Sequence, residues 1–320
     1  MEVYMIIKFR NKPLPLQYLE ALIPRLPQHF PKLADLKRDA AKRAKGYIGE
    51  KKVDYHLDLL ADQYPILQDV NLQIGDKRAQ FDTIVIGKHA IFLIEIKNVS
   101  DTITFDTVHR QLIRDNGEKE EGFRYPITQA ETQRLLLLHW LRINKFEQIP
   151  VNYFIAISEP STIIQVKGNQ DAITDVVAHA EYIPHMLVNQ DANMKGKKVI
   201  PARQIANQLL TDCQEFNIDL RNYYGIRKSD ILPGIQCTEC QWLGMKRIYG
   251  KWHCPKCKHL STDAHNRALY DYFLLIKPWI SNPECMTFLK LNSRHTAKRI
   301  LQSANLTYHP GKRIWTQSRK

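Results

Sequence analysis

Acidic side chains occur at the ends of two apolar runs in the first third of the chain. The run 91–97 reads IFLIEIK, and because side chains in a strand alternate between faces, Glu95 and Lys97 extend an otherwise apolar face. The run 81–86 reads FDTIVI, where Asp82 lies on the same face as the two isoleucines. A hairpin between the two runs would bring Asp82 close to Glu95 and Lys97.

A helix expected over residues 36–61 supplies a third carboxylate. Glu50 lies on one helical stripe with Val53, Leu57 and Leu60, so it should face the sheet. Inward carboxylates repel one another and are costly to desolvate, and a divalent cation relieves both effects. Mg²⁺ binds carboxylates together with substrate phosphate oxygens, and it lowers the pKa of a coordinated water. Lys97 would orient that water or stabilise the developing charge.

Four sequence blocks resemble the nuclease-related domain (NERD) family of the PD-(D/E)xK nuclease superfamily, over roughly residues 40–210. They are GYIGEKKVDYHLDLL around Glu50, AQFDTIVIG around Asp82, IFLIEIKN around Glu95 and Lys97, and YPITQAETQRLLLL around Gln129. The resemblance departs at Phe81, which replaces a proline that the superfamily itself often lacks, and at Asp101, where the family commonly has a glycine.

The resemblance implies a restriction-endonuclease-like fold that cleaves DNA with Mg²⁺ or Mn²⁺. It also implies that Asp82 and Glu95 bind the metal, that Glu50 supports it, that Lys97 is the catalytic lysine, and that Gln129 lies at the site. Taken singly, these residues have plainer interpretations: an ion pair at a strand end, a turn residue, a solvated helix acid and a polar residue at a helix start. The alternative function is therefore a nuclease-fold DNA-binding protein without activity.

Two C-x-x-C pairs near residue 245 predict a second, structural metal site. Cys237 and Cys240 form one pair, and Cys254 and Cys257 form the other. Two such turns can close a tetrahedral site of four thiolates around Zn²⁺, with no open position for chemistry. This pattern is typical of a zinc ribbon.

Basic and aromatic residues interleave between the two cysteine pairs. Lys246, Arg247 and Lys251 alternate with Trp242, Tyr249 and Trp252, which suits phosphate contact and base stacking. Equally, the aromatic residues could form the core of this small region.

The last 35 residues, 286–320, contain eight Lys or Arg and no Asp or Glu. They predict a helix that starts after Ser293 and a hairpin that turns at residues 310–311, in the manner of a winged helix-turn-helix. The candidate DNA contacts here are Arg294, His295, Lys298, Arg299, Lys312 and Arg313. A basic helical pair that docks on a protein is the alternative.

The composition favours a polyanionic partner. There are 46 Lys and Arg against 33 Asp and Glu, a formal net charge of +13, and such a surplus is typical of nucleic-acid binding. We expect DNA as the partner, with RNA and a helicase or other DNA-processing protein as further candidates. No apolar run approaches the roughly 20 residues of a membrane span, and the first residues do not resemble a signal peptide, so we expect a cytoplasmic protein.

These observations predict an α/β protein with a restriction-endonuclease-like mixed sheet flanked by helices. The expected parts are an extended lead-in, the NERD nuclease-like domain, a zinc ribbon and a basic helix-turn-helix-like domain. Their predicted boundaries are 1–33, 34–218, 230–262 and 264–320.

Overall fold

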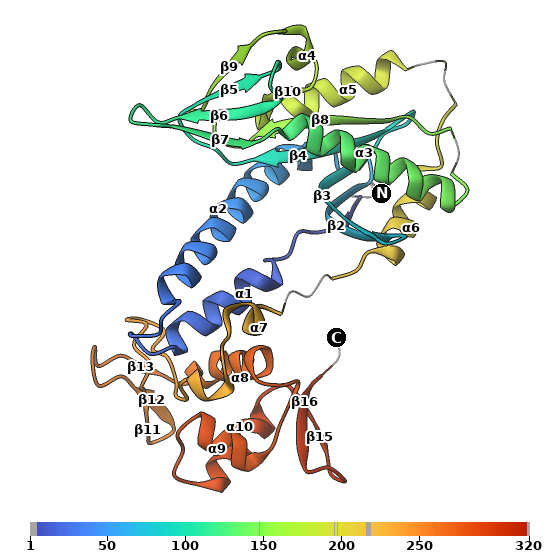
Figure 1. Ribbon diagram of the computed structural model, residues 1–320. Helices are drawn as coiled ribbons and strands as arrows, with labels where there is room; N and C mark the ends of the chain where they lie inside the picture. The colour runs from blue at the N-terminus through green and yellow to red at the C-terminus, as the bar shows by residue number, and fades with distance from the viewer. Residues whose placement is uncertain (1–4, 147, 195, 197, 216–218, 319–320) are drawn as a thin grey trace. The chain divides into compact units, whose positions relative to one another are not determined.

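The computed structural model describes residues 5–146, 148–194, 196, 198–215 and 219–318, and the chain divides into two compact units. The sheet unit comprises Met1–Lys12 and Ala44–Phe216, and the cysteine unit comprises Pro13–Arg43 and Asn217–Lys320. Helix α2 (Leu33–Leu57) contributes residues to both units (Figure 1). Among the helices of the described residues, none has the length and hydropathy that a membrane span needs.

The sheet unit is built around a six-stranded mixed sheet. In spatial order its strands are β1 (Ile6–Lys8), β2 (Ile66–Ile74), β3 (Lys77–Ile86), β4 (Ile91–Lys97), β8 (Val151–Ile157) and β10 (Val177–His179). The strands β2, β3 and β4 pair antiparallel, whereas β1, β8 and β10 join in parallel to their neighbours. The predicted hairpin thus forms between β3 and β4.

Helices cover both faces of this sheet, because β3 and β4 are apolar on both sides. One face packs on α3 (Pro126–Ile143) and α6 (Ala202–Asp212), for example through Leu93 against Leu137. The other packs on α2, the 3₁₀ turn Asp58–Leu60, and α5 (Ile183–Asn193). The mixed α/β sheet flanked by helices agrees with the predicted fold class.

A second, four-stranded sheet follows the end of β4. Its spatial order is β7 (Glu120–Arg124), β6 (Gln111–Asp115), β5 (Thr102–Asp106) and β9 (Ile163–Lys167). Alternating apolar residues in β5 and β6 form its buried side. Asp101, just before β5, has a left-handed φ of 73°, a conformation that glycine adopts most readily.

Short elements connect this second sheet to α5 and complete the sheet unit. They are α4 (Asp171–Thr174) and the 3₁₀ turn Ala180–Tyr182.

The cysteine unit combines short helices with two small sheets. Its helices are α1 (Leu14–Leu22), the start of α2, α7 (Leu220–Tyr224), α8 (Ala264–Leu275), α9 (Asn282–Phe288) and α10 (Arg294–Ser303), with 3₁₀ turns at Ile23–Arg25 and Lys228–Asp230. One sheet has the order β11 (Lys246–Ile248), β12 (Lys251–His253) and β13 (Leu260–Ser261). The other has the order β14 (Trp279–Ile280), β16 (Ile314–Gln317) and β15 (Leu306–His309).

The predicted extended lead-in over residues 1–33 is wrong for its second half, which is helical. Leu16, Leu19 and Leu22 recur at helical spacing and are buried, and Leu19 and Leu22 share a hydrophobic cluster with Leu220 and Leu275. Two of the prolines in this segment, Pro13 and Pro15, lie at the start of α1, where a missing N–H costs nothing. The structure therefore groups residues 13–43 with the C-terminal part of the chain.

Candidate active site and metal centre

The β3–β4 hairpin brings Asp82 and Glu95 together. Thr83 pairs with Ile94 across the antiparallel hairpin, so the next residues, Asp82 and Glu95, lie opposite each other. The backbone N–H of Ile96 donates to Oδ2 of Asp82 at 2.9 Å. The Glu95 side chain is almost fully buried, and both of its oxygens have partners. The sheet thus holds one partly exposed and one buried carboxylate side by side.

Lys97 lies between the sheet and α3. Its Nζ donates to Oε1 of Glu95 at 2.7 Å and to Oε1 of Gln129 at 3.1 Å. Gln129 lies in the first turn of α3, which begins at Pro126 directly after the extended residue Tyr125. The ammonium group is therefore fixed by residues of two separate elements.

Gln133, which the sequence analysis missed, completes this cluster. Its Nε2 donates to Oε2 of Glu95 at 2.8 Å and to the carbonyl oxygen of Gln80 at 3.0 Å. It follows Gln129 by one helical turn, so the same face of α3 presents both amides. That i, i+4 spacing of two glutamines was the signal in the sequence that could have found it.

The electrostatics of the cluster favour a bound cation. Burial, and next the charges of Glu95 and Glu50, raise the pKa of Asp82 well above its usual range. The Ile96 N–H and the guanidinium of Arg10 oppose this shift without overcoming it. A carboxylate that is costly to ionise alone becomes favourable to ionise beside a divalent metal ion.

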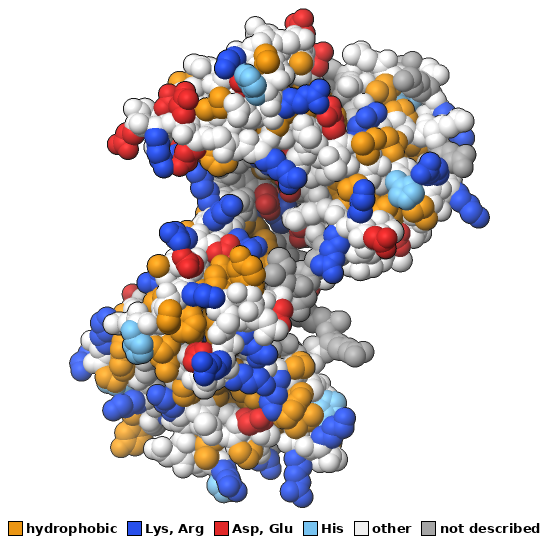
Figure 2. Space-filling model, in the orientation of Figure 1, with side chains coloured by type: hydrophobic (Ala, Val, Ile, Leu, Met, Phe, Trp, Pro, Cys, Tyr) orange, Lys and Arg blue, Asp and Glu red, His pale blue; other side chains and the backbone are white. Residues whose placement is uncertain are grey.

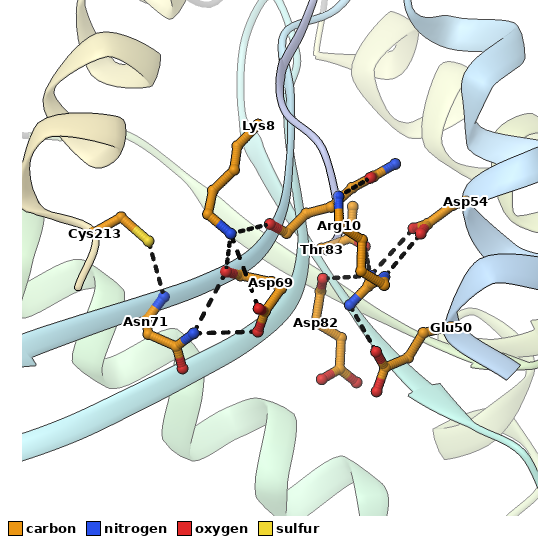
Figure 3. A network of polar contacts seen from close by, with 10 residues as sticks. Lys8, Arg10, Glu50, Asp54, Asp69, Asn71, Asp82, Thr83 and Cys213 are labelled. Atoms are coloured by element: carbon orange, nitrogen blue, oxygen red, sulfur yellow. Dashed lines mark hydrogen bonds and ion pairs between the residues drawn. The ribbon is translucent and has the colours of Figure 1, made fainter. Parts of the chain in front are cut away.

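Glu50 lies apart from Lys97 and is paired with Arg10. Nη1 of Arg10 donates to Oε2 of Glu50 at 2.9 Å. The guanidinium lies between Glu50 and Asp54, while the Asp82 carboxylate points away from it (Figure 3). Burial raises the pKa of Glu50, and Arg10 opposes that rise. Arg10 was not predicted as a site residue.

A close helix–strand approach sets the position of Glu50. A Cβ added to Gly49 would lie 2.4 Å from Cβ of Asn98, so only glycine allows α2 to come this near the end of β4. Asn98 also donates from Nδ2 to the carbonyl oxygen of Lys45 at 2.6 Å. Two of the sequence blocks, GYIGE and IEIKN, are thus joined in space.

The four predicted cysteines meet in one cluster in the cysteine unit. Their sulfur atoms all lie within 4.8 Å of one another. The Sγ atoms of Cys237 and Cys257 are 3.6 Å apart, as are those of Cys240 and Cys254, close to the roughly 3.8 Å edge of a tetrahedron with zinc–sulfur bonds of about 2.3 Å. The donor set and its size fit zinc.

The two cysteine turns have the same backbone geometry. The N–H of Gln241 donates to the carbonyl oxygen of Cys237 at 3.1 Å, and that of Lys258 donates to Cys254 at 2.9 Å. Both Gln241 and Lys258 have positive φ, 60° and 66°. Burial raises the pKa of Cys254, but backbone N–H groups and the Cys240 and Cys257 thiols together lower the value to about 7, which favours the thiolate that a metal needs.

The aromatic residues around the cysteines divide into core and surface. Trp252 is fully buried, and its Nε1–H donates to Nδ1 of His265 at 3.1 Å. Tyr249 is fully exposed at the β11–β12 turn, and Trp242 is partly exposed. Trp252 is therefore part of the core, whereas base stacking by Tyr249 and Trp242 stays a prediction.

The predicted basic residues lie at the surface of the cysteine unit. In α10, Ala297, Ile300 and Leu301 are buried, and the helix starts at Ser293 as predicted. The exposed residues are Lys246, Lys251, Arg294, His295, Lys298, Arg299, Lys312 and Arg313. Arg247 is half-buried, with its guanidinium 4.8 Å from the Trp252 ring centroid. Figure 2 shows many Lys and Arg side chains on the drawn face of this unit.

A comparison with protein families places a nuclease-related segment within the α/β sheet unit. The family model described as "Nuclease-related domain" matches residues 45–158. The predicted resemblance is thereby confirmed for this segment, which contains the five predicted residues from Glu50 to Gln129, together with Gln133. Searches of curated proteins and of solved structures returned no match.

Proposed function

We propose that this protein is a metal-dependent nuclease that hydrolyses phosphodiester bonds in DNA. The observation that carries the proposal is the cluster of Asp82, Glu95 and Lys97, with Glu95 and Lys97 held by amides of α3. A nuclease-related family match over the same residues supports it.

Asp82 and Glu95 would hold one Mg²⁺ or Mn²⁺ ion. The chemistry that such an ion supplies is a water of lowered pKa and stabilisation of charge on the phosphate. The partly exposed Asp82 would turn from its single N–H partner toward the ion. Glu95 would share its oxygens between the ion, Lys97 and Gln133.

Lys97 would act on the substrate side of the site. Its ammonium is partly exposed, so it can exchange Gln129 for a phosphate oxygen or for the attacking water. The hydrogen bond to Glu95 fixes the position of the ammonium group, and a positioned cation of this kind stabilises developing negative charge.

The cysteine unit would bind the nucleic acid. The order of α8, β14, α9, α10, β15 and β16, with β16 between the other two strands, is that expected of a winged helix. In that arrangement α10 would enter a major groove and the residues between β15 and β16 would contact the backbone. A structural Zn²⁺ at the four cysteines would hold the neighbouring β11–β12 hairpin.

Arg247 and Arg299 support an anionic partner at this surface. Burial, and next the charge of Arg299, lower the pKa of Arg247. Within the described residues no carboxylate forms an ion pair with either guanidinium. Two uncompensated positive charges that lie close together favour a phosphate.

The test is cleavage of duplex, single-stranded and branched DNA, and of RNA, with Mg²⁺ or Mn²⁺. We expect metal-dependent cleavage by the wild type and a loss of about 100-fold or more in Asp82→Asn. Asp76→Asn, which changes an exposed carboxylate at the β2–β3 turn, serves as the matched control.

Equal cleavage by the wild type and Asp82→Asn would refute the assigned site. Salt-sensitive DNA binding without any metal-dependent cleavage would favour the alternative, an inactive nuclease-fold DNA-binding protein. Cleavage of RNA alone would leave the site in place and change the substrate.

A further inference from the structure

Arg10 lies inside the acidic cluster although it comes from the N-terminal segment, far away in the sequence. Its Nε and Nη2 donate to the two oxygens of Asp54 at 2.8 and 3.1 Å, and its Nη1 donates to Glu50 at 2.9 Å. Nη2 also reaches the carbonyl oxygen of Asp82 at 2.7 Å and Oγ1 of Thr83 at 3.0 Å. Every nitrogen of the guanidinium is therefore engaged (Figure 3).

The burial of Arg10 excludes a direct role toward substrate. Its side chain is only 3% exposed, so a phosphate cannot reach it without unfolding of the surrounding chain. Its backbone is fixed as well, because the Arg10 N–H donates to Oε1 of the buried Gln68 at 2.7 Å. Arg10 is thus a permanent cation of the fold, and it can act only through the groups that it holds.

The charges of the cluster leave room for one divalent ion. Its carboxylates are Glu50, Asp54, Asp82 and Glu95, and its fixed cations are Arg10 and Lys97. Two negative charges remain, which one divalent ion neutralises. The nearby Asp69 is paired with Lys8, whose Nζ lies 4.0 Å from its Oδ2 and donates to two backbone carbonyl oxygens, so that pair adds no net charge.

We propose that Arg10 takes the place of a second metal ion, so that the site holds a single divalent metal at Asp82 and Glu95. Glu50 is then a partner of Arg10 and not a metal ligand. This inference rests on the proposed function, because it concerns the metal on which that function depends.

Two-metal nuclease sites supply the contrast. Their ions lie about 3.5–4 Å apart and are clamped by shared carboxylates. Here the carboxylates nearest to Asp82 on the α2 side are already bound by a guanidinium: both oxygens of Asp54 and one of Glu50 accept from Arg10. A second divalent ion would have to displace a buried charge that cannot lose its proton.

The experiment counts bound Mn²⁺ on the full-length, zinc-loaded chain, from the electron paramagnetic resonance signal of free Mn²⁺. We expect one Mn²⁺ per wild-type chain at saturation. Glu50→Gln should weaken Mn²⁺ binding by less than about tenfold, because loss of a residue that holds a metal ligand in place typically costs about 10- to 100-fold in affinity. Asp82→Asn removes a ligand itself and should weaken binding by more than about 100-fold.

Two Mn²⁺ ions per wild-type chain would overturn the proposal and leave the nuclease assignment intact. Loss of binding in Glu50→Gln equal to that in Asp82→Asn would do the same, because it would make Glu50 a ligand. No bound Mn²⁺ in the wild type would instead refute the proposed metal-dependent function itself.

Two substitutions of Arg10 refine the result. Arg10→Lys keeps the positive charge and should bind one Mn²⁺. Arg10→Gln removes the charge and should admit a second, weaker Mn²⁺ near Glu50 and Asp54. If Arg10→Gln does not fold, the wild-type count and the Glu50→Gln comparison decide the proposal without it.

Discussion

The two units differ in charge as strongly as in architecture. The cysteine unit contains 24 Lys and Arg and 9 Asp and Glu, a formal net charge of +15, whereas the sheet unit contains 22 and 24, a net charge of −2. The whole surplus of the chain thus belongs to one unit. The candidate catalytic site lies in the sheet unit. That unit is nearly neutral overall, and its cluster of carboxylates has fewer positive than negative charges.

The units also differ in what stabilises them. The sheet unit buries a six-stranded sheet between helices. The cysteine unit has two three-stranded sheets with strands of two to four residues, and its hydrophobic cluster includes Cys237 and Cys254 themselves. The short strands β11, β12 and β13 around the cysteines bury little by themselves, and segments of that size need a cross-link or a metal. Binding and cleavage should therefore fail separately when each unit is perturbed, and the following predictions test that separation.

Removal of zinc should have the largest effect. Zinc binding contributes on the order of 10 kcal/mol to small zinc domains, so Cys254→Ser should unfold much of the cysteine unit and abolish DNA binding. Hydrogen exchange by mass spectrometry should show loss of protection in residues 235–317 but not in β2, β3 and β4. Cys213→Ser, outside the cluster, is the control. Unchanged protection after zinc removal would contradict a structural role.

The buried ion pair of Arg25 and Asp271 should come next. Nη2 of Arg25 lies 2.9 Å from Oδ2 of Asp271, and both side chains are 1% exposed. Arg25→Met should destabilise the cysteine unit by about 3 kcal/mol, because the buried Asp271 carboxylate then keeps only its ion pair with Arg267. Arg38→Met removes an exposed ion pair with Asp35 in the same unit and should cost less than about 1 kcal/mol. Urea unfolding followed by tryptophan fluorescence measures both, and equal costs would refute the distinction.

Charge removal from α10 should weaken DNA binding without changing the chemistry. Lys298→Ala with Arg299→Ala should lower the slope of log affinity against log salt by about 0.9 for each lost phosphate contact. Cleavage at saturating DNA should stay the same. Fluorescence anisotropy over a range of salt concentrations measures the slope. Lys77→Ala in the sheet unit is the control, and an equal change there would show that only net charge matters.

The smallest expected effect concerns Asp82 in metal-free protein. The pKa of Asp82 is higher in the folded protein than in the unfolded chain, where it is near 3.8, so folding favours the protonated carboxyl group. The stability of the fold therefore falls as the pH rises from the unfolded-state pKa through the folded-state pKa. Asp82→Asn should therefore raise the melting temperature at pH 8 by a few degrees, about 1 kcal/mol, and the gain should shrink at lower pH. Thermal scans in a chelator measure this, and a gain that grows at low pH would contradict the sign.

The local parts of both sites could be predicted from the sequence. Strand alternation in residues 91–97 and 81–86 placed Glu95, Lys97 and Asp82 on one face, because a tight hairpin leaves little choice of register. The spacing of the cysteine pairs predicted their cluster, since each pair fixes two sulfur atoms within one turn. The roles of these residues stay predictions until activity and metal binding are measured.

Contacts between distant segments could not be predicted. Arg10 follows a three-residue strand with no pattern of its own, and its role depends on the parallel pairing of β1 with β2. The helix α1 was missed because its prolines outweighed its leucine spacing. The second sheet was not predicted because β7 is polar and largely exposed, and β9 buries its apolar residues only in part.

The most direct test compares DNA affinity and cleavage in Lys97→Met, with Lys77→Met as the matched control. Single-turnover cleavage with Mn²⁺ is measured at equal DNA occupancy, after folding and zinc content are verified. We predict an affinity within about twofold of the wild type and a cleavage rate at least about 100-fold lower. Cleavage at the wild-type rate by Lys97→Met would contradict a catalytic site in the sheet unit.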